Sequence, residues 1–375
     1  MLRKFSVENF KNFQGKFVFD LSKPGNYAFN TDCIRNGVVD KAAIYGINGI
    51  GKSNFGLAIF DIVNTLTDKY KLLYKYDNFL NLNSFKHYAT FEYEFIFDGV
   101  ILTYTYSKTN VSNLLQESLS INNKEMIYYN FEQRAGFSNF PGSESLNLNN
   151  NSPISRVKFI METAILKDDN PYNIVLNKFR NFVNRMLLFY SLKENNFIGF
   201  KNESYLLEDI IISKGKVQDF ENFLNLQGLN IRLTTIDTSE GKKIYFKYRN
   251  GLAHFLKECS TGMSSLILIY TWLLQMDECS FVYIDKFDAF YHYELSEIII
   301  NELKKFNYTQ IIVTTHNTDL LNNDLMRPDC YFVLTNNKIE SLNRLTEKDI
   351  RFAHNLQKMF KSGAFNNNRE HAYKN

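Results

Sequence analysis

Hydrophobic and polar positions alternate in short runs near the amino end of the chain, a pattern that predicts β-strands. Arg3–Val7 and Lys16–Leu21 alternate in this way, and Phe91–Phe97 and Val100–Tyr106 flank the dipeptide Asp98-Gly99. An Asp-Gly pair between two alternating runs is a strong signal for a tight hairpin turn. The first hundred or so residues therefore predict a layer of paired strands.

Other runs are apolar through their whole middle, which is typical of strands buried on both faces. These runs are Lys41–Tyr45, Phe281–Asp285 and Gln310–Thr315. Segments with helical spacing of apolar residues lie between them: Asn54 to about Tyr76, Met263–Met276 and Leu295–Phe306. Alternation of buried strands with helices predicts an α/β fold with a mostly parallel sheet beside the mixed β layer.

The middle of the chain has a different pattern. From about Leu114 to Leu229 we predict a mainly helical insertion, and strands return at Asn230–Asp237 and Lys242–Tyr248. The predicted division is residues 1–112 as an amino-terminal lobe, 113–229 as the insertion and 230–375 as a carboxy-terminal lobe. Heptads do not persist in the insertion, so no long coiled coil is expected.

Composition narrows the class of protein. The 375 residues include 43 basic and 40 acidic side chains, a formal charge of +3, so no broad positive field for nucleic acid is expected, although local patches and DNA binding stay open. The start has no apolar signal-peptide core, and the longest apolar run, Leu266–Met276, is too short to span a bilayer. We expect a cytoplasmic protein without a membrane partner.

The strongest chemical signal is Gly-Ile-Asn-Gly-Ile-Gly-Lys-Ser at residues 46–53, directly after the apolar run Lys41–Tyr45. In such a loop the glycines let backbone N–H groups surround phosphates, Lys52 reaches the outer phosphates and Ser53 holds Mg²⁺. The sequence therefore predicts binding of ATP with Mg²⁺. The expected nucleotide-binding residues are Gly46, Asn48, Gly49, Gly51, Lys52, Ser53 and Asn54.

Three later segments fit the same site. Asp285 ends an apolar strand and could hold Mg²⁺, and His316 ends another and could contact the γ-phosphate. Ser260-Thr-Gly262 precedes an apolar helix, where backbone N–H groups and the helix dipole favour phosphate. Each has a plainer explanation by itself: an ordinary strand end, a structural histidine and a simple helix cap.

The order of these motifs resembles that of RecF- and SMC-like ABC ATPases. The compact length and the lack of arms are similar to the stand-alone ATPases of bacterial anti-phage systems, of the OLD-like and abortive-infection types. The segments that carry the resemblance are Asn9-Phe-Lys-Asn-Phe13, the P-loop, Ser260-Thr-Gly262, Ile284-Asp-Lys-Phe-Asp-Ala-Phe-Tyr-His292, Thr314-Thr-His-Asn317 and Asp324-Leu-Met-Arg-Pro-Asp329.

The resemblance implies an ABC-type P-loop ATPase head and a role for each motif. Gly46–Asn54 would be Walker A, Asp285 the end of Walker B, Phe287–His292 the D-loop and His316 the switch histidine. Ser260, Thr261 and Gly262 would form the signature, which faces ATP held by a partner head, so a homodimer or larger homo-oligomer is implied. Gln116 and Gln133 are both open as the Q-loop residue.

One residue departs from the resemblance. The family places a catalytic glutamate after the Walker B aspartate, where this chain has Lys286. An ammonium group has no acceptor for the proton of the attacking water, so we predict impaired hydrolysis. Asp288 is a possible substitute base, although it matches the D-loop.

The resemblance favours a sensor or regulatory ATPase in anti-phage defence that controls a separately encoded effector, either a nuclease or a toxin. A RecF-like repair ATPase that clamps DNA is one alternative. A scaffold that ATP locks without hydrolysis, and that sequesters a toxin or nuclease, is the other, and Lys286 favours it.

Overall fold

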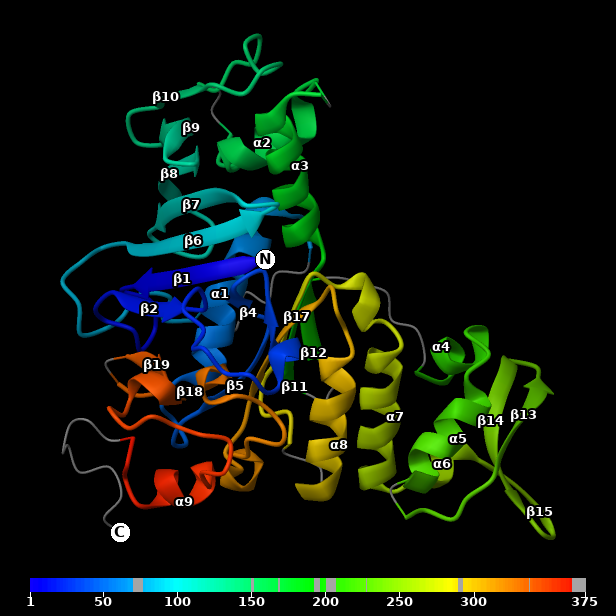
Figure 1. Cartoon of the computed structure of the whole chain (residues 1–375). Coiled ribbons are helices and arrows are strands. Elements are labelled where there is room, and N and C mark those ends of the chain that lie inside the picture. The colour runs from blue at the N-terminus through cyan, green and yellow to red at the C-terminus, as the bar shows by residue number, and fades with distance from the viewer. Residues whose placement is uncertain are drawn as a thin grey trace.

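The computed structural model describes residues 1–69, 77–149, 152–167, 169–191, 196–199, 207–226, 228–288, 293–336 and 338–365. In this part of the chain two seven-stranded sheets lie one above the other, and a smaller unit projects to one side (Figure 1). Helix α1 (Lys52–Leu66) lies between the two sheets.

The outer sheet is antiparallel, with the strand order β10-β9-β8-β7-β6-β1-β2. Its predicted hairpin is confirmed, because Phe97 pairs with Val100 across Asp98 and Gly99, whose φ angles of 51° and 81° suit a tight primed turn. The strands are β1 (Leu2–Glu8), β2 (Phe17–Asp20), β6 (Ala89–Phe97), β7 (Val100–Lys108), β8 (Leu114–Ile121), β9 (Lys124–Asn130) and β10 (Ala135–Ser138).

The central sheet has the strand order β12-β11-β16-β17-β5-β18-β19. The five inner strands are parallel, and β12 and β19 are antiparallel edges. The α/β prediction with a mostly parallel sheet is confirmed. The strands are β5 (Lys41–Tyr45), β11 (Met186–Ser191), β12 (Asn196–Gly199), β16 (Phe281–Ile284), β17 (Gln310–Thr314), β18 (Tyr331–Leu334) and β19 (Ile339–Ser341).

Helix α1 joins the two sheets through its side chains. The ring of Phe55 lies 5.4–5.9 Å from rings of the outer layer, including those of Phe5 and Phe19. On the opposite side Gly56 faces Tyr283 of β16, and a Cβ at Gly56 would lie 2.8 Å from that ring. The absence of a side chain at Gly56 therefore lets α1 approach the central sheet closely.

The prediction of a mainly helical segment over residues 113–229 is wrong in two places. Residues 114–138 form β8, β9 and β10, whose period-2 burial continues the outer sheet beyond the predicted hairpin. Strand β11 belongs to the central sheet beside β16, and a short apolar run of this kind cannot be told from buried helix by pattern alone. The helices in this interval are α2 (Arg156–Thr163), α3 (Pro171–Asn184), α4 (Leu207–Ser213) and α5 (Val217–Leu226).

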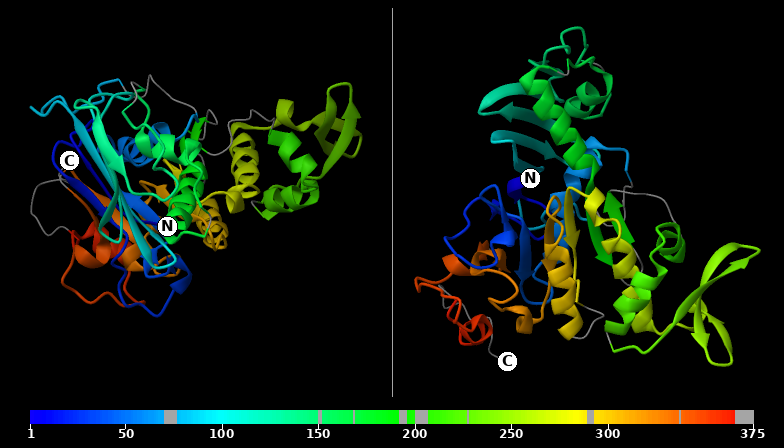
Figure 2. Two further views of the ribbon diagram at one scale, coloured as in Figure 1. Left: turned by 90° about the horizontal axis from the view of Figure 1, so that it is seen from above. Right: turned by 45° about the vertical axis from the view of Figure 1, so that its right-hand side comes forward.

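Residues 207–258 form an arm that projects away from the two sheets (Figure 2). A three-stranded sheet in the arm confirms the strands predicted there, and α4 and α5 contact α7 (Thr261–Leu273). Helix α8 (Tyr293–Lys304) stands beside α7 in both views. The remaining arm elements are β13 (Leu233–Thr238), β14 (Gly241–Tyr248), β15 (Gly251–His254) and α6 (Phe255–Glu258).

The remaining strands and helix lie near the two ends of the chain. They are β3 (Ile34–Arg35), β4 (Val38–Val39) and α9 (Leu356–Lys361). Among the described residues no helix is both long enough and apolar enough to cross a membrane.

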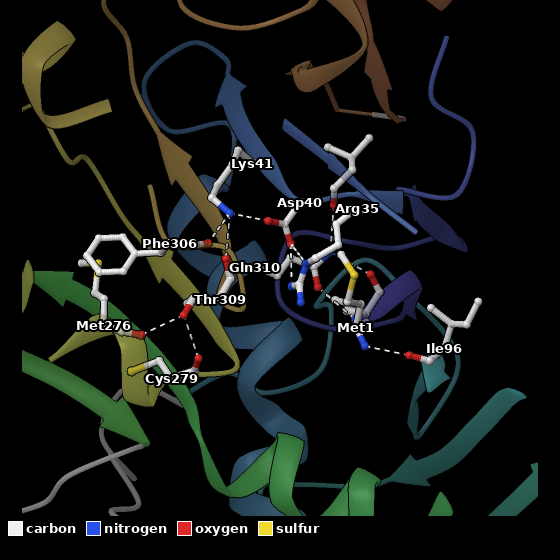
Figure 3. Close-up of polar contacts among 12 residues, drawn as sticks. Met1, Arg35, Asp40, Lys41, Ile96, Met276, Cys279, Phe306, Thr309 and Gln310 are labelled. Atoms are coloured by element: carbon white, nitrogen blue, oxygen red, sulfur yellow. Dashed lines mark hydrogen bonds and ion pairs between the residues drawn. The ribbon is translucent and has the colours of Figure 1, made fainter. Parts of the chain in front are cut away.

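A buried polar network fastens the amino ends of the central strands to the outer sheet (Figure 3). The side chain of Gln310 accepts a hydrogen bond from the backbone N–H of Leu2 and donates to the carbonyls of Leu2 and Val39, each at 2.9 Å. The ammonium of Lys41 donates to the carbonyls of Phe306 and Thr309, both at 2.9 Å, and pairs with Asp40. The carboxyl ends of these strands are left for the site.

Candidate nucleotide-binding site

The P-loop connects the carboxyl end of β5 to the first turn of α1. Gly49 and Gly51 have φ angles of 79° and 109°, which residues with a side chain rarely adopt. Gly51 also needs to be glycine because a Cβ there would run into the side-chain amide of Asn12. The loop thus has the tight curvature that turns successive N–H groups toward one point.

Asn12 braces this loop from the segment Asn9–Phe13. Its amide nitrogen donates to the carbonyl of Ile50 at 3.1 Å, and its oxygen accepts from the side chain of Asn54 at 2.8 Å. The sequence identified this segment only as a motif. The structure gives Asn12 a contact with each end of the glycine-rich loop.

The ammonium of Lys52 lies folded over its own loop. It donates to the carbonyls of Gly46 at 2.7 Å and Ile47 at 3.2 Å, and lies 3.4 Å from Nδ1 of His316. Burial lowers the pKa of Lys52 to about 8, and the nearby positive charge of Lys286 lowers it further while Asp285 opposes that effect. A phosphate would replace these carbonyls as the partner of the ammonium.

Ser53 and Asp285, the two expected magnesium ligands, are in direct contact. The Ser53 hydroxyl donates to Oδ2 of Asp285 at 2.5 Å, and Thr314 donates to Oδ1 at 2.6 Å. Asp285 is 3% exposed. A hydroxyl and a carboxylate are hard oxygen donors of the kind that Mg²⁺ takes, so the residues present fit this ion.

His316 follows β17 and reaches the same place. Its side chain is exposed, and burial of its ring together with the charge of Lys52 lowers its pKa. A lowered pKa favours the neutral imidazole, which has one acceptor and one donor nitrogen. The expected grouping of His316 with the P-loop therefore occurs in the fold.

Lys286 and Asp288 lie just beyond Asp285. Lys286 has a left-handed backbone with φ of 51°, its N–H donates to the hydroxyl of Thr314 at 2.7 Å, and its side chain is exposed. The carboxylate of Asp288 accepts from the hydroxyl of Thr315 at 2.6 Å. Of the predicted D-loop, residues 289–292 lie outside the described residues.

The predicted signature caps α7. Ser260 is the N-cap, and its hydroxyl accepts from the N–H of Met263 at 3.3 Å. Thr261 begins the helix, and a Cβ at Gly262 would meet only the Ser260 hydroxyl, at 3.9 Å. In both views α8 stands between α7 and β5 (Figures 1 and 2). This helix start is thus presented outward, on the far side of α8 from the P-loop strand.

Neither glutamine considered for the Q-loop reaches the site. Gln116 lies in β8 and Gln133 follows β9, both in the outer sheet. The strand that runs beside Asp285 is instead β11, because Phe189 accepts the N–H of Asp285 at 2.8 Å. Sequence reasoning missed β11, whose one signal was the apolar run Met186–Tyr190.

Comparison with solved structures returns head domains of SMC proteins. The SMC head bound to the C-winged helix domain of ScpA is 15% identical, covers 91% of this chain and 98% of that chain, and has a TM-score of 0.49. For the SMC head domain from Thermotoga maritima the values are 15%, 91%, 99% and 0.45. For an SMC head with an extended coiled coil, bound to the C-terminal domain of ScpA from Pyrococcus furiosus, they are 14%, 92%, 97% and 0.43. No curated protein matched the chain.

Residues 41–322 match the family described as "AAA domain, putative AbiEii toxin, Type IV TA system". The matched region begins with β5 and ends beyond His316, so it contains the P-loop, the signature segment and Asp285. It spans well over half of the 375 residues. The chain therefore belongs to this family and is an ABC-class P-loop ATPase.

Proposed function

We propose that this chain binds ATP with Mg²⁺ at the carboxyl ends of β5, β16 and β17. The observation that carries the proposal is the contact between Ser53 and Asp285, which brings Walker A and Walker B together. Lys52 and His316 meet beside that contact, so one place holds a phosphate-binding cation, two oxygen ligands and a neutral imidazole. When bound there, Mg²⁺ neutralises part of the charge on the outer phosphates.

We propose that two heads close around ATP. The outward start of α7 supports this, because Ser260 leaves backbone N–H groups of the first turn for a phosphate and Gly262 leaves open space in front of them. Since α8 separates this helix from β5 within one chain, the phosphate would come from a second copy. Nucleotide would then hold a homodimer, or a larger homo-oligomer, together.

The chain holds ATP longer than it hydrolyses it. A cation at residue 286 supplies no acceptor for the water proton, and the nearest following carboxylate, Asp288, is already paired with Thr315. This favours a lock that ATP closes and that opens slowly. Such a lock suits the regulatory subunit of a defence system that restrains or recruits a separate toxin or nuclease, and the toxin–antitoxin description of the family supports that role.

The deciding experiment is a calorimetric titration of the parent chain and of Lys52→Ala with ATP and Mg²⁺. Loss of the ammonium should weaken binding roughly a hundredfold or more, because charge-assisted hydrogen bonds contribute about 1.5–3 kcal/mol each and Lys52 makes more than one. Lys305→Ala is the control, because Lys305 lies just beyond α8 and is 67% exposed. Equal affinities for the parent and Lys52→Ala would contradict the proposed site.

A further inference from the structure

Lys286 has a fixed place in the site that the loss of a catalytic base does not account for. Its N–H is held by Thr314, whose hydroxyl also donates to Asp285, so the backbone of Lys286 is tied to the Walker B carboxylate. The positive φ of 51° aims the chain away from the direction that an extended strand would continue. The exposed ammonium is thus attached to a rigid backbone position.

Three basic side chains share the space beside the P-loop. Lys52 and His316 are 3.4 Å apart, and the charge of Lys286 acts on both, since it contributes to the lowered pKa of each. Lys52 is the residue that reaches the outer phosphates in a P-loop. Lys286 therefore faces the region where the terminal phosphate of ATP would lie. A glutamate at the same position would present the opposite charge to that phosphate.

We propose that Lys286 is a specificity-determining residue that binds the γ-phosphate and makes the site select ATP over ADP by charge. An ammonium with three donors can hold a terminal phosphate that carries more than one negative charge, whereas ADP places no phosphate at that position. The inference rests on the proposed binding of ATP at this site. It assigns Lys286 a gain in binding, separate from the loss of hydrolysis.

The test measures ATP and ADP affinities with Mg²⁺ for the parent, Lys286→Arg, Lys286→Gln and Lys286→Glu. All four carry Gly262→Glu, so that head closure does not add to the affinity. Lys286→Gln should weaken ATP binding about ten- to a hundredfold while ADP affinity changes by less than about threefold, because one charge-assisted contact is lost to the γ-phosphate alone. Lys286→Arg should keep the parent's ratio of affinities, and Lys286→Glu should lose the most.

Lys305→Gln in the same background controls for the loss of one positive charge from the chain, and circular dichroism reports whether each variant is folded. If ATP and ADP affinities fall equally in Lys286→Gln, or if Lys286→Arg behaves like Lys286→Gln, the assignment is overturned although ATP binding stands. If the parent binds neither nucleotide, the proposed function fails first. If Lys286→Gln is unfolded, the ratio in Lys286→Arg and Lys286→Glu decides: equal ratios overturn the assignment, and loss in the Glu variant alone supports it.

Discussion

The hydroxyl of Ser53 donates a hydrogen bond to the carboxylate of Asp285 at 2.5 Å, although the two residues are 232 positions apart in the chain. Thr314 donates to the other oxygen of the same carboxylate at 2.6 Å. The first turn of α1, the end of β16 and the end of β17 therefore share one buried acid. Any ligand that moves Ser53 acts directly on the segment that carries Lys286 and Asp288.

The composite ATP site predicts the effect of Gly262→Glu. A glutamate at the start of α7 adds bulk and a negative charge opposite the γ-phosphate of the partner, so ATP should no longer drive dimerisation. Light scattering should show the variant as a monomer with ATP, while its ATP affinity at low protein concentration stays within about threefold of the parent. The Cβ of residue 262 meets only Ser260 Oγ at 3.9 Å, so the fold should tolerate the change. Closure of Gly262→Glu with ATP would rule out this composite site.

The charge at residue 286 predicts the rate of hydrolysis. Lys286→Glu should raise phosphate release about 10²–10⁴-fold, the usual contribution of a general base. Adding His316→Ala to Lys286→Glu should lower the release again, because the imidazole lies beside Lys52 at the expected γ-phosphate. The measurement is steady-state phosphate release at saturating ATP. Equal turnover by the parent and Lys286→Glu would instead identify Asp288 or another carboxylate as the base.

A buried ion pair between α1 and the outer sheet predicts a large loss of stability. Lys108 and Asp61 are 2% and 0% exposed, their charged atoms lie 2.8 Å apart, and Tyr106 also donates to Asp61 at 2.9 Å. Lys108→Met leaves the carboxylate buried without its cation, so it should lower the free energy of unfolding by about 3–5 kcal/mol. Denaturant titration measures this change.

Two further variants test the cause of that loss. Asp61→Asn added to Lys108→Met should recover part of the stability, since no charge then remains buried. Lys305→Met, at an exposed site, should change the free energy of unfolding by less than about 0.5 kcal/mol. A loss in Lys108→Met no larger than in Lys305→Met would show that this pair does not hold α1 to the outer sheet.

Glu117 predicts how stability depends on pH. Burial raises the pKa of its carboxyl above the ordinary value of 4.5, while donors from Ser155, Arg156 and Tyr104 oppose the rise. In the pH range between 4.5 and that raised pKa, the folded chain keeps a proton that the unfolded chain has lost. The group therefore stabilises the fold below 4.5, and this contribution is lost as pH rises through the folded pKa.

Glu117→Gln removes this titration. The difference in free energy of unfolding between the parent and Glu117→Gln should therefore shift against the parent as pH rises from 4.5 toward neutrality. Chemical denaturation at several pH values measures it. A difference that stays constant across this range would show that the carboxyl does not titrate differently in the folded and unfolded chains.

The amino-acid sequence by itself determined the features that depend on neighbouring residues. The hairpin at Asp98-Gly99 and the turn of the P-loop follow from backbone conformations that few residues can adopt, so their local pattern is sufficient. The buried strands β5, β16 and β17 were also predictable, because continuous apolar runs exclude solvent-exposed strands. From the order of these strands, Asp285 and His316 could be expected at one edge of a parallel sheet.

Only the tertiary structure decided which distant segments meet. Strand β11 carries the same kind of apolar run as a buried helix, and only its pairing with β16 places it in the central sheet. The contact of Asn12 with Ile50 and Asn54 and the tie between Thr314 and Lys286 likewise join residues through pairings of long range. Local periodicity states which face of a segment is buried but not which partner covers it, so these contacts had to come from the folded chain.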